Sequence, residues 1–134
     1  MRYLLDTNIV SYFVKGVSTN LVQRMQDCMA AKDCAISAVT RAELRYGLEL
    51  MDKFDKRRRR IDLVLKELTT LPWSIEAADE FGRTRAYLHR NGTPVGEFDT
   101  QIAAHALAEK LILVTHNTRH FEHVPRLKLE DWMA

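Results

Sequence analysis

The sequence has only two cysteines, no long apolar run and little net charge. Five residues separate Cys28 from Cys34, which does not match a CxxC redox or zinc pair, so we interpret both as reduced and structural. The first residues, MRYLLDTNIV, contain too few apolar residues before Asp6 for a secretory signal or a membrane span. We therefore expect a cytoplasmic protein with no membrane partner. A net charge of +2 does not by itself indicate nucleic-acid binding.

The remaining composition is that of one folded domain. The 134 residues are 46% hydrophobic and 28% charged, so we expect a single domain over residues 1–134. Short apolar runs alternate with segments of helical spacing, which predicts βαβ units and a parallel sheet. The predicted strands are Tyr3–Leu5, Cys34–Ser37, Leu71–Trp73 and Leu111–Thr115, with a possible edge strand at Leu127–Glu130. The predicted helices are Ile9–Lys15, Asn20–Ala31, Thr40–Lys53, Asp55–Thr69, Ile75–Arg90 and Phe98–Glu109.

Polar residues follow these strands where a parallel sheet usually binds its ligands. Asp6-Thr7-Asn8 follows the first strand, Glu43 lies just beyond the second, and Thr115 and Asn117 follow the strand at Leu111. Asp99 opens the helix that leads into that last strand. Ligands of open parallel sheets collect outside the carboxyl ends of the strands. We therefore expect these residues to meet in one site.

Asp6 and Glu43 each have a structural alternative. Asp6 fits a helix N-cap, although Thr7 and Asn8 offer the same capping oxygens and would leave Asp6 free to face the cleft. Thr40-Arg-Ala-Glu43 fits a capping box, in which Glu43 would close its own helix start. Against this, Glu43 shares a helical stripe with Tyr46, Gly47 and Leu50 that we expect to face the domain.

Asp99 lies on one helical face with three small or apolar residues, at spacings of three, four and seven: Ile102, Ala103 and Ala106. We expect that face to be buried. An acid in the first turn also stabilises a helix N-terminus, but by only about 0.3–1 kcal/mol. That gain is smaller than the several kcal/mol that burial of an unpaired carboxylate costs. The position of Asp99 therefore favours a paired or metal-bound carboxylate.

Three carboxylates at one end of a sheet would repel each other. At about 4 Å and an effective dielectric near 20, each pair costs roughly 4 kcal/mol, which a divalent cation would remove. Oxygen ligands without paired cysteines suit Mg²⁺, with Mn²⁺ as a substitute. Asp6, Glu43 and Asp99 are thus predicted metal ligands and catalytic residues. The chemistry that follows is attack of activated water on a phosphodiester.

Four sequence blocks cover nearly the whole chain: LLDTNIVSYFV, SAVTRAELRYGLE, GTPVGEFDTQIAAHA and LILVTHNTRHFEHVPRLKLEDW. In order and spacing, these blocks resemble the VapC toxins of the PIN-domain family. The resemblance implies a PIN-like three-layer α/β/α fold with a central parallel sheet of four to five strands. It places the family's acids at Asp6, Glu43 and Asp99 and its Thr-x-Asn block at Thr115 and Asn117. Asn117 would orient water or an acid.

The resemblance also implies a function and partners. It implies that the protein is the toxin of a type II toxin–antitoxin system and acts as a Mg²⁺-dependent endoribonuclease. A cognate VapB-type antitoxin would inhibit it. The building unit would be a homodimer, and this chain would make no DNA contact. Similarity to the enteric branch suggests cleavage of initiator tRNA in the anticodon loop. Many relatives have an acid where this chain has His120, and Glu122 is a nearby substitute.

Two other functional classes remain open. One is a catalytically weak PIN-fold module that binds RNA or antitoxin, which the presence of all three acids argues against. The other is an aspartyl-phosphate phosphohydrolase, which would need a second Asp where Asn8 stands.

Several other residues have both a structural and a functional interpretation. His116 and His120 would ligate zinc only in a helical segment. The run Lys56–Arg60 suits either phosphate contact or a solvated helix face, and Arg83, Arg85 and Arg90 have the same two interpretations. Trp73 and Trp132 favour core or sheet-edge packing over base stacking.

Overall fold

The computed structural model describes residues 1–134, which form five strands and seven helices. The strands are β1 (Tyr3–Leu5), β2 (Cys34–Ser37), β3 (Thr69–Leu71), β4 (Ile112–Val114) and β5 (Leu129–Glu130). The helices are α1 (Thr7–Lys15), α2 (Thr19–Ala30), α3 (Ala38–Leu50), α4 (Lys56–Glu67), α5 (Ile75–Arg90), α6 (Glu97–Glu109) and α7 (Thr118–Phe121). The predicted bounds of β1, β2 and α5 are confirmed.

The five strands form one parallel sheet in the order β3-β2-β1-β4-β5. Leu4 is in register with Ala35 of β2, and Leu5 is in register with Val114 of β4. One residue further on, Asp6 is therefore flanked by Ser37 and Thr115 at the carboxyl edge. The predicted parallel sheet of four to five strands is confirmed.

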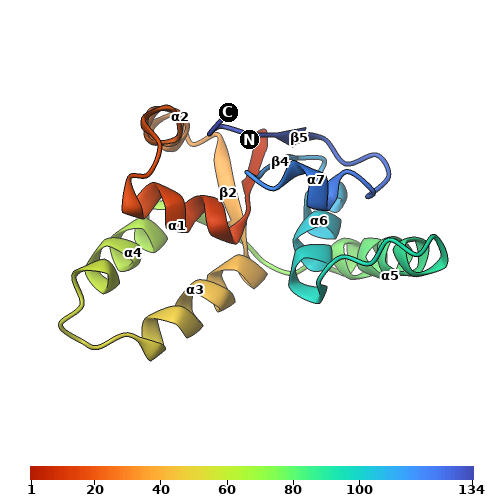
Figure 1. The fold of residues 1–134 in the computed structure, drawn as a ribbon, viewed down its shortest axis with the longest axis horizontal. Helices are drawn as coiled ribbons and strands as arrows, with labels where there is room; N and C mark the ends of the chain where they lie inside the picture. Colours follow the sequence, from red (N-terminus) through yellow and green to blue (C-terminus); the bar gives the residue numbers. More distant parts are fainter.

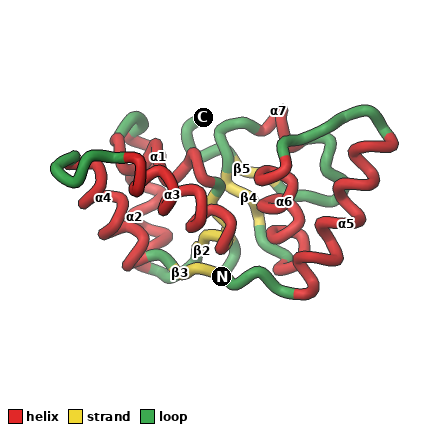
Figure 2. The backbone as a smooth tube through the Cα atoms, turned by 90° about the horizontal axis from the view of Figure 1, so that it is seen from below, coloured by secondary structure: helices red, strands yellow, loops and turns green.

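Helices cover both faces of the sheet because its strands are apolar on both sides. Successive side chains alternate, so Tyr3 and Leu5 join one buried cluster and Leu4 joins the other. Helices α1 to α4 cover the first face, whereas α5 and α6 cover the second, as the two views show (Figures 1 and 2). The result is the predicted three-layer α/β/α fold.

The third predicted strand was placed two residues too late. Strand β3 is Thr69–Leu71, because Thr70 pairs with Ile36 and Leu71 with Ser37, the last residue of β2. Pro72 follows directly and has no N–H to continue the ladder. Trp73 lies outside the strand and packs edge-on against His105, with ring centroids 5.4 Å apart.

The packing of Trp132 and the reduced state of the cysteines are as predicted. Trp132 is buried and meets the Tyr3 ring edge-on at 5.0 Å, which brings the C-terminal segment beside β1 (Figure 1). Cys28 and Cys34 are free and buried, and burial raises the pKa of both thiols. No helix combines the length and the apolar composition that crossing a membrane requires.

Candidate active site

Asp6 lies at the centre of the carboxyl edge, between the end of β1 and the start of α1. Its backbone N–H donates to the Val114 carbonyl at 3.0 Å, so the residue extends the β1–β4 pairing by one position. Its side chain is the N-cap of α1, and Oδ1 accepts from the Ile9 N–H at 2.8 Å. The expectation that Thr7 or Asn8 would cap the helix in its place is wrong. Besides this cap, the carboxylate interacts with the Thr115 hydroxyl at the end of β4.

The environment of Asp6 opposes its negative charge. Only 5% of the residue is exposed, and burial, with smaller contributions from the negative charges of Asp99 and Glu43, raises its pKa from 3.8 to about 6. The Thr115 hydroxyl and the Ile9 N–H oppose that rise. Because the charges of Glu43 and Asp99 are felt at Asp6, the three predicted acids belong to one electrostatic site.

Glu43 is held by α1 and not by its own helix start. The Thr7 hydroxyl donates to Glu43 Oε1 at 2.7 Å and lies 3.1 Å from the Thr40 hydroxyl. The capping-box interpretation is wrong, since α3 begins at Ala38 with Ser37 as its N-cap. Glu43 therefore reaches the site as a side chain projecting from the first helical turns.

The predicted orientation of the rest of α3 is also wrong. The buried side chains of the helix are Thr40, Leu44 and Leu48, whereas Tyr46 and Leu50 are 68% and 71% exposed. Helix α3 thus packs on the sheet through a different stripe from the one expected. The stripe that carries Glu43 and Tyr46 runs along the border between the core and solvent.

Asp99 comes from the other helical layer and is half-exposed. Its three predicted companions on α6 are fully buried, as expected: Ile102, Ala103 and Ala106. The Asp99 side chain itself is 42% exposed, because it lies in the first turn, beyond the carboxyl edge. The expectation of a buried carboxylate is therefore wrong for Asp99 and applies to Asp6 instead.

His120 contacts Asp99 directly. The imidazole Nε2 lies 2.9 Å from Asp99 Oδ2, and the short helix α7 carries it there. Glu122, the alternative residue, is 59% exposed and lies 3.8 Å from the His123 ring. Of the two, His120 is the one that touches a predicted ligand.

The three carboxylates provide a suitable donor set but not a closed ligand cage. No group of three His, Cys, Asp or Glu side chains is arranged to hold a metal ion, and each of the three acids is engaged by a protein donor or by His120. Carboxylate oxygens are suitable ligands for a hard divalent cation. Such a cation would also compensate the negative charges of the three acids, whose effect is seen in the raised pKa of Asp6. Their assignment as metal ligands remains a prediction.

The Thr115–Asn117 segment contacts the site through Thr115. The Thr115 hydroxyl accepts from the Asn117 N–H at 3.0 Å and is buried beside Asp6. Asn117 is the N-cap residue of α7, but its side chain makes no capping hydrogen bond and is exposed. The predicted role of the Asn117 side chain therefore remains a prediction.

A buried pair, Ser37 and His105, lies at the carboxyl end of β2, and the sequence did not predict that these two residues would meet. Ser37 Oγ accepts from the Val39 N–H at 3.0 Å and lies 2.7 Å from His105 Nδ1. Burial lowers the pKa of His105. The pair connects the start of α3, which carries Glu43, with α6, which carries Asp99. A serine at the end of a predicted strand was the only available sequence signal.

Some of the histidines and arginines in the two clusters bind partners within the chain. His116 pairs with Asp131 at 3.0 Å while His120 faces Asp99, so the zinc alternative is wrong. Within the basic run, Arg57 binds Asp55 at 2.7 Å. Arg58 donates to the Leu48 and Met51 carbonyls at the end of α3. Lys56, Arg59 and Arg60 form no ion pair and stay available for phosphate contacts.

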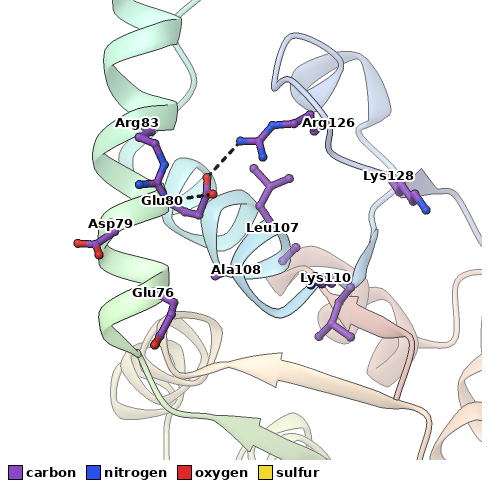
Figure 3. A pocket seen from close by; sticks show the side chains of 11 residues that line it. Glu76, Asp79, Glu80, Arg83, Leu107, Ala108, Lys110, Arg126 and Lys128 are labelled. Carbon is purple, nitrogen blue, oxygen red and sulfur yellow. Dashed lines mark hydrogen bonds and ion pairs between the residues drawn. The ribbon is translucent and has the colours of Figure 1, made fainter.

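Two hollows differ in their distance from the acids. A cavity of about 590 Å³ lies between α5 and the end of α6, where Arg83 and Arg126 bind Glu80 at 3.1 and 3.5 Å (Figure 3). None of its lining residues belongs to the carboxylate site. A second hollow, of about 460 Å³, is lined by Ala42, Glu43, Tyr46 and Phe98. This smaller hollow opens directly beside the acids.

The fold and the carboxylate edge correspond to a known class of protein. The PIN domain family matches residues 3–127 of the chain, a span that contains Asp6, Glu43 and Asp99. The chain therefore belongs to the PIN-domain family.

Its curated relatives narrow this assignment to the VapC ribonucleases. Ribonuclease VapC2 of Haemophilus influenzae is 40% identical over 133 residues, which are 99% of each chain. The tRNA(fMet)-specific endonuclease VapC of Shigella flexneri is 39% identical over 98% of each chain. The protein belongs to this VapC branch, and this assignment favours the nuclease over the phosphohydrolase alternative.

Solved structures agree with the assignment. VapBC2 of Rickettsia felis, bound to a DNA fragment from its promoter, contains a chain with a TM-score of 0.89 and 32% identity, covering 98% of this chain and 99% of that one. A chain in the structure of DNA-bound VapBC from Salmonella typhimurium has a TM-score of 0.84 and 34% sequence identity, and the match covers 98% of both chains. PIN-domain nucleases generally use divalent metal ions, which agrees with the oxygen-rich site.

Proposed function

We propose that this protein is the toxin of a type II toxin–antitoxin pair, a divalent-metal-dependent endoribonuclease with Asp6, Glu43 and Asp99 as its catalytic carboxylates. The observation that carries the proposal is the buried, charge-coupled Asp6, whose pKa is raised by burial and by the two other acids. Burial of Asp6 beside two further acids opposes its charge and costs stability in the absence of a cation. A cation site explains their placement.

Each side chain has a distinct task in this mechanism. Asp6 is fixed by its bond to the Ile9 N–H, so it presents one oxygen in a constant direction. Thr7 holds Glu43 in place, and His120 lies against Asp99. When bound, a divalent cation lowers the pKa of a water molecule and stabilises charge on the scissile phosphate. Asn117 follows Thr115 and is exposed, and in this mechanism its amide would orient water. Mg²⁺ suits these ligands, with Mn²⁺ as a substitute.

The proposed substrate and partners follow from the relatives. The Shigella relative is named for tRNA(fMet), which supports initiator tRNA, cut in its anticodon loop, as the substrate here. The solved VapBC complexes support a cognate VapB-type antitoxin as the inhibitor. We further propose a homodimer acting in the cytoplasm, with DNA contacts made by the antitoxin and not by this chain.

The proposal is tested by incubating purified protein with total tRNA, with Mg²⁺ and with EDTA, and mapping the products. We expect one discrete cut that EDTA abolishes and that Mg²⁺ or Mn²⁺ restores. Glu43→Gln and Asp99→Asn should each abolish the cut, because each removes a charge at the cation site. Glu49→Gln is the matched control, since Glu49 is an exposed acid on the same helix as Glu43.

The outcomes separate the alternatives. RNA binding without any cleavage would indicate the catalytically weak binding module. Full activity of one acid variant would remove that residue from the mechanism. A cut that persists in EDTA would refute the metal-dependent chemistry as a whole.

A further inference from the structure

Two exposed aromatic side chains, Tyr46 and Phe98, border the carboxylate site. Tyr46 is 68% exposed and Phe98 is 57% exposed, and neither packs against another aromatic ring or a cation. Other rings do find such partners, as Tyr3 does with Trp132 and Tyr12 with His116. The two exposed rings are therefore available to a ligand.

The two rings come from opposite helical layers and line one hollow. Tyr46 lies on α3, one turn after Glu43, and Phe98 lies on α6, directly before Asp99. Figure 1 shows these helices on the two sides of the sheet, with their site-bearing ends converging. The hollow measures about 460 Å³, and Glu43 is its only charged lining residue. A ligand there touches the carboxylate site.

The chemistry of the walls selects the ligand. Three acids repel phosphate except where a cation intervenes, so this hollow does not suit a second phosphate group. Apolar and aromatic walls suit the flat face of a nucleobase, and stacking on aromatic rings is how proteins hold unpaired bases. The volume lies within the usual range of about 300–1,000 Å³ for small-ligand sites.

We propose that Tyr46 and Phe98 hold one unpaired base of single-stranded RNA next to the phosphate that is cut. This inference rests on the proposed function and adds a substrate-binding site to it. The competing occupant is a second copy of the chain. A base is favoured over a second copy because the hollow, of about 460 Å³, is the size of a small-ligand site and has Glu43 of the carboxylate site in its wall.

The test is a thermodynamic cycle between a protein side chain and an RNA base. Stem-loop RNAs, each with one abasic loop position, are titrated against wild type and Phe98→Ala in EDTA, so that binding is measured without cleavage. At the contacted position we expect the abasic change to weaken wild-type binding about tenfold and to have no further effect on Phe98→Ala. Tyr46→Ala should give the same pattern.

Two variants show whether the aromatic face is what binds. Phe98→Trp and Tyr46→Phe should retain wild-type affinity, because each keeps a stacking surface. Tyr87→Ala is the matched control, since Tyr87 is an exposed aromatic residue on α5, outside this hollow. It should bind every RNA as wild type does. Circular dichroism confirms folding, which exposed positions should not disturb.

Three results would overturn the proposal. The first is that, at every loop position, the loss of binding affinity from the abasic change simply adds to the loss from the alanine substitution. This would mean that neither ring contacts a base. The second is an oligomer that Tyr46→Ala or Phe98→Ala dissociates, measured by sedimentation, since the hollow would then be a self-interface. The third is wild type that binds no RNA. A wild type that binds RNA but does not cut it would contradict the proposed nuclease and leave the cycle interpretable.

Discussion

Substituting Asp6 by asparagine should abolish cleavage and yet stabilise the metal-free fold. Asparagine keeps an oxygen for the Ile9 N–H and is as good an N-cap as aspartate. It removes a charge that burial and two neighbouring acids oppose. The substitution thus separates the structural role of this residue from its proposed metal-binding role.

The magnitude follows from the pKa of Asp6. Folding raises that pKa from 3.8 to about 6, a span of roughly two pH units, each worth about 1.4 kcal/mol. Above about pH 6 the ionised carboxylate therefore lowers the free energy of unfolding by up to about 3 kcal/mol. This penalty is absent below about pH 4, where Asp6 is protonated in both states, and it grows between these two values.

Urea denaturation of wild type and Asp6→Asn in EDTA measures the effect. Near pH 7.5 the variant should have a free energy of unfolding about 1–3 kcal/mol higher, and near pH 4 the two proteins should coincide. Excess Mg²⁺ should stabilise wild type more than the variant, because binding to the native state adds stability. A variant that is no more stable than wild type near pH 7.5 in EDTA would refute the reasoning.

A second N-cap aspartate provides a control of opposite sign. Asp55 caps α4 and binds Arg57, and these contacts lower its pKa to about 2. Its stabilising contribution is present above about pH 4 and is lost as the pH falls towards 2. Asp55→Asn should therefore reduce stability near pH 7.5. A stabilising effect of both substitutions would indicate a general preference for asparagine and not the site charge.

The remaining predictions concern pH, substrate binding and metal demand. Cleavage at limiting Mg²⁺ should fall about tenfold per pH unit below about pH 6 as Asp6 becomes protonated, and a pH–rate profile flat to about pH 5 would contradict this. Arg58→Ala should cost about 1–2 kcal/mol in urea denaturation without changing the salt dependence of RNA binding, because Arg58 is bonded to backbone carbonyls. Neutralising Arg59 and Arg60 should flatten that salt dependence and leave stability and the cut position unchanged. His120→Glu should lower the Mg²⁺ concentration for half-maximal activity by adding an anionic ligand beside Asp99, and superimposable titrations would place His120 outside the site.

Local patterns determined most of the fold. Alternating apolar runs identified β1 and β2 to the residue, because strands covered on both faces are short, apolar and bounded by polar residues. Helix α5 was equally clear, with Ser74 before it and the Asn91-Gly92 turn after it. The placement of Asp6 and Glu43 after strand ends, and of Asp99 at a helix start, led to the prediction that the three acids share one site, which remains a prediction.

What local patterns could not determine was how deeply each acid is buried and what it contacts. Asp99 lies on an apolar helical face, yet it projects beyond the sheet, whereas Asp6 is enclosed between β4 and α1. Glu43 is held by Thr7, 36 positions away, and Asp99 meets His120, 21 positions away.

The sequence also could not predict the partners of the basic run. Arg58 was expected to contact solvent or RNA, but it donates to backbone carbonyls at the end of α3. Burial and side-chain partners depend on which distant segments pack together. A helical or strand period fixes the direction of a side chain relative to its own element but not what lies opposite it. Only the tertiary packing of both helical layers on one sheet decided that Asp6 is the buried acid whose pKa is raised by burial and by the two other carboxylates.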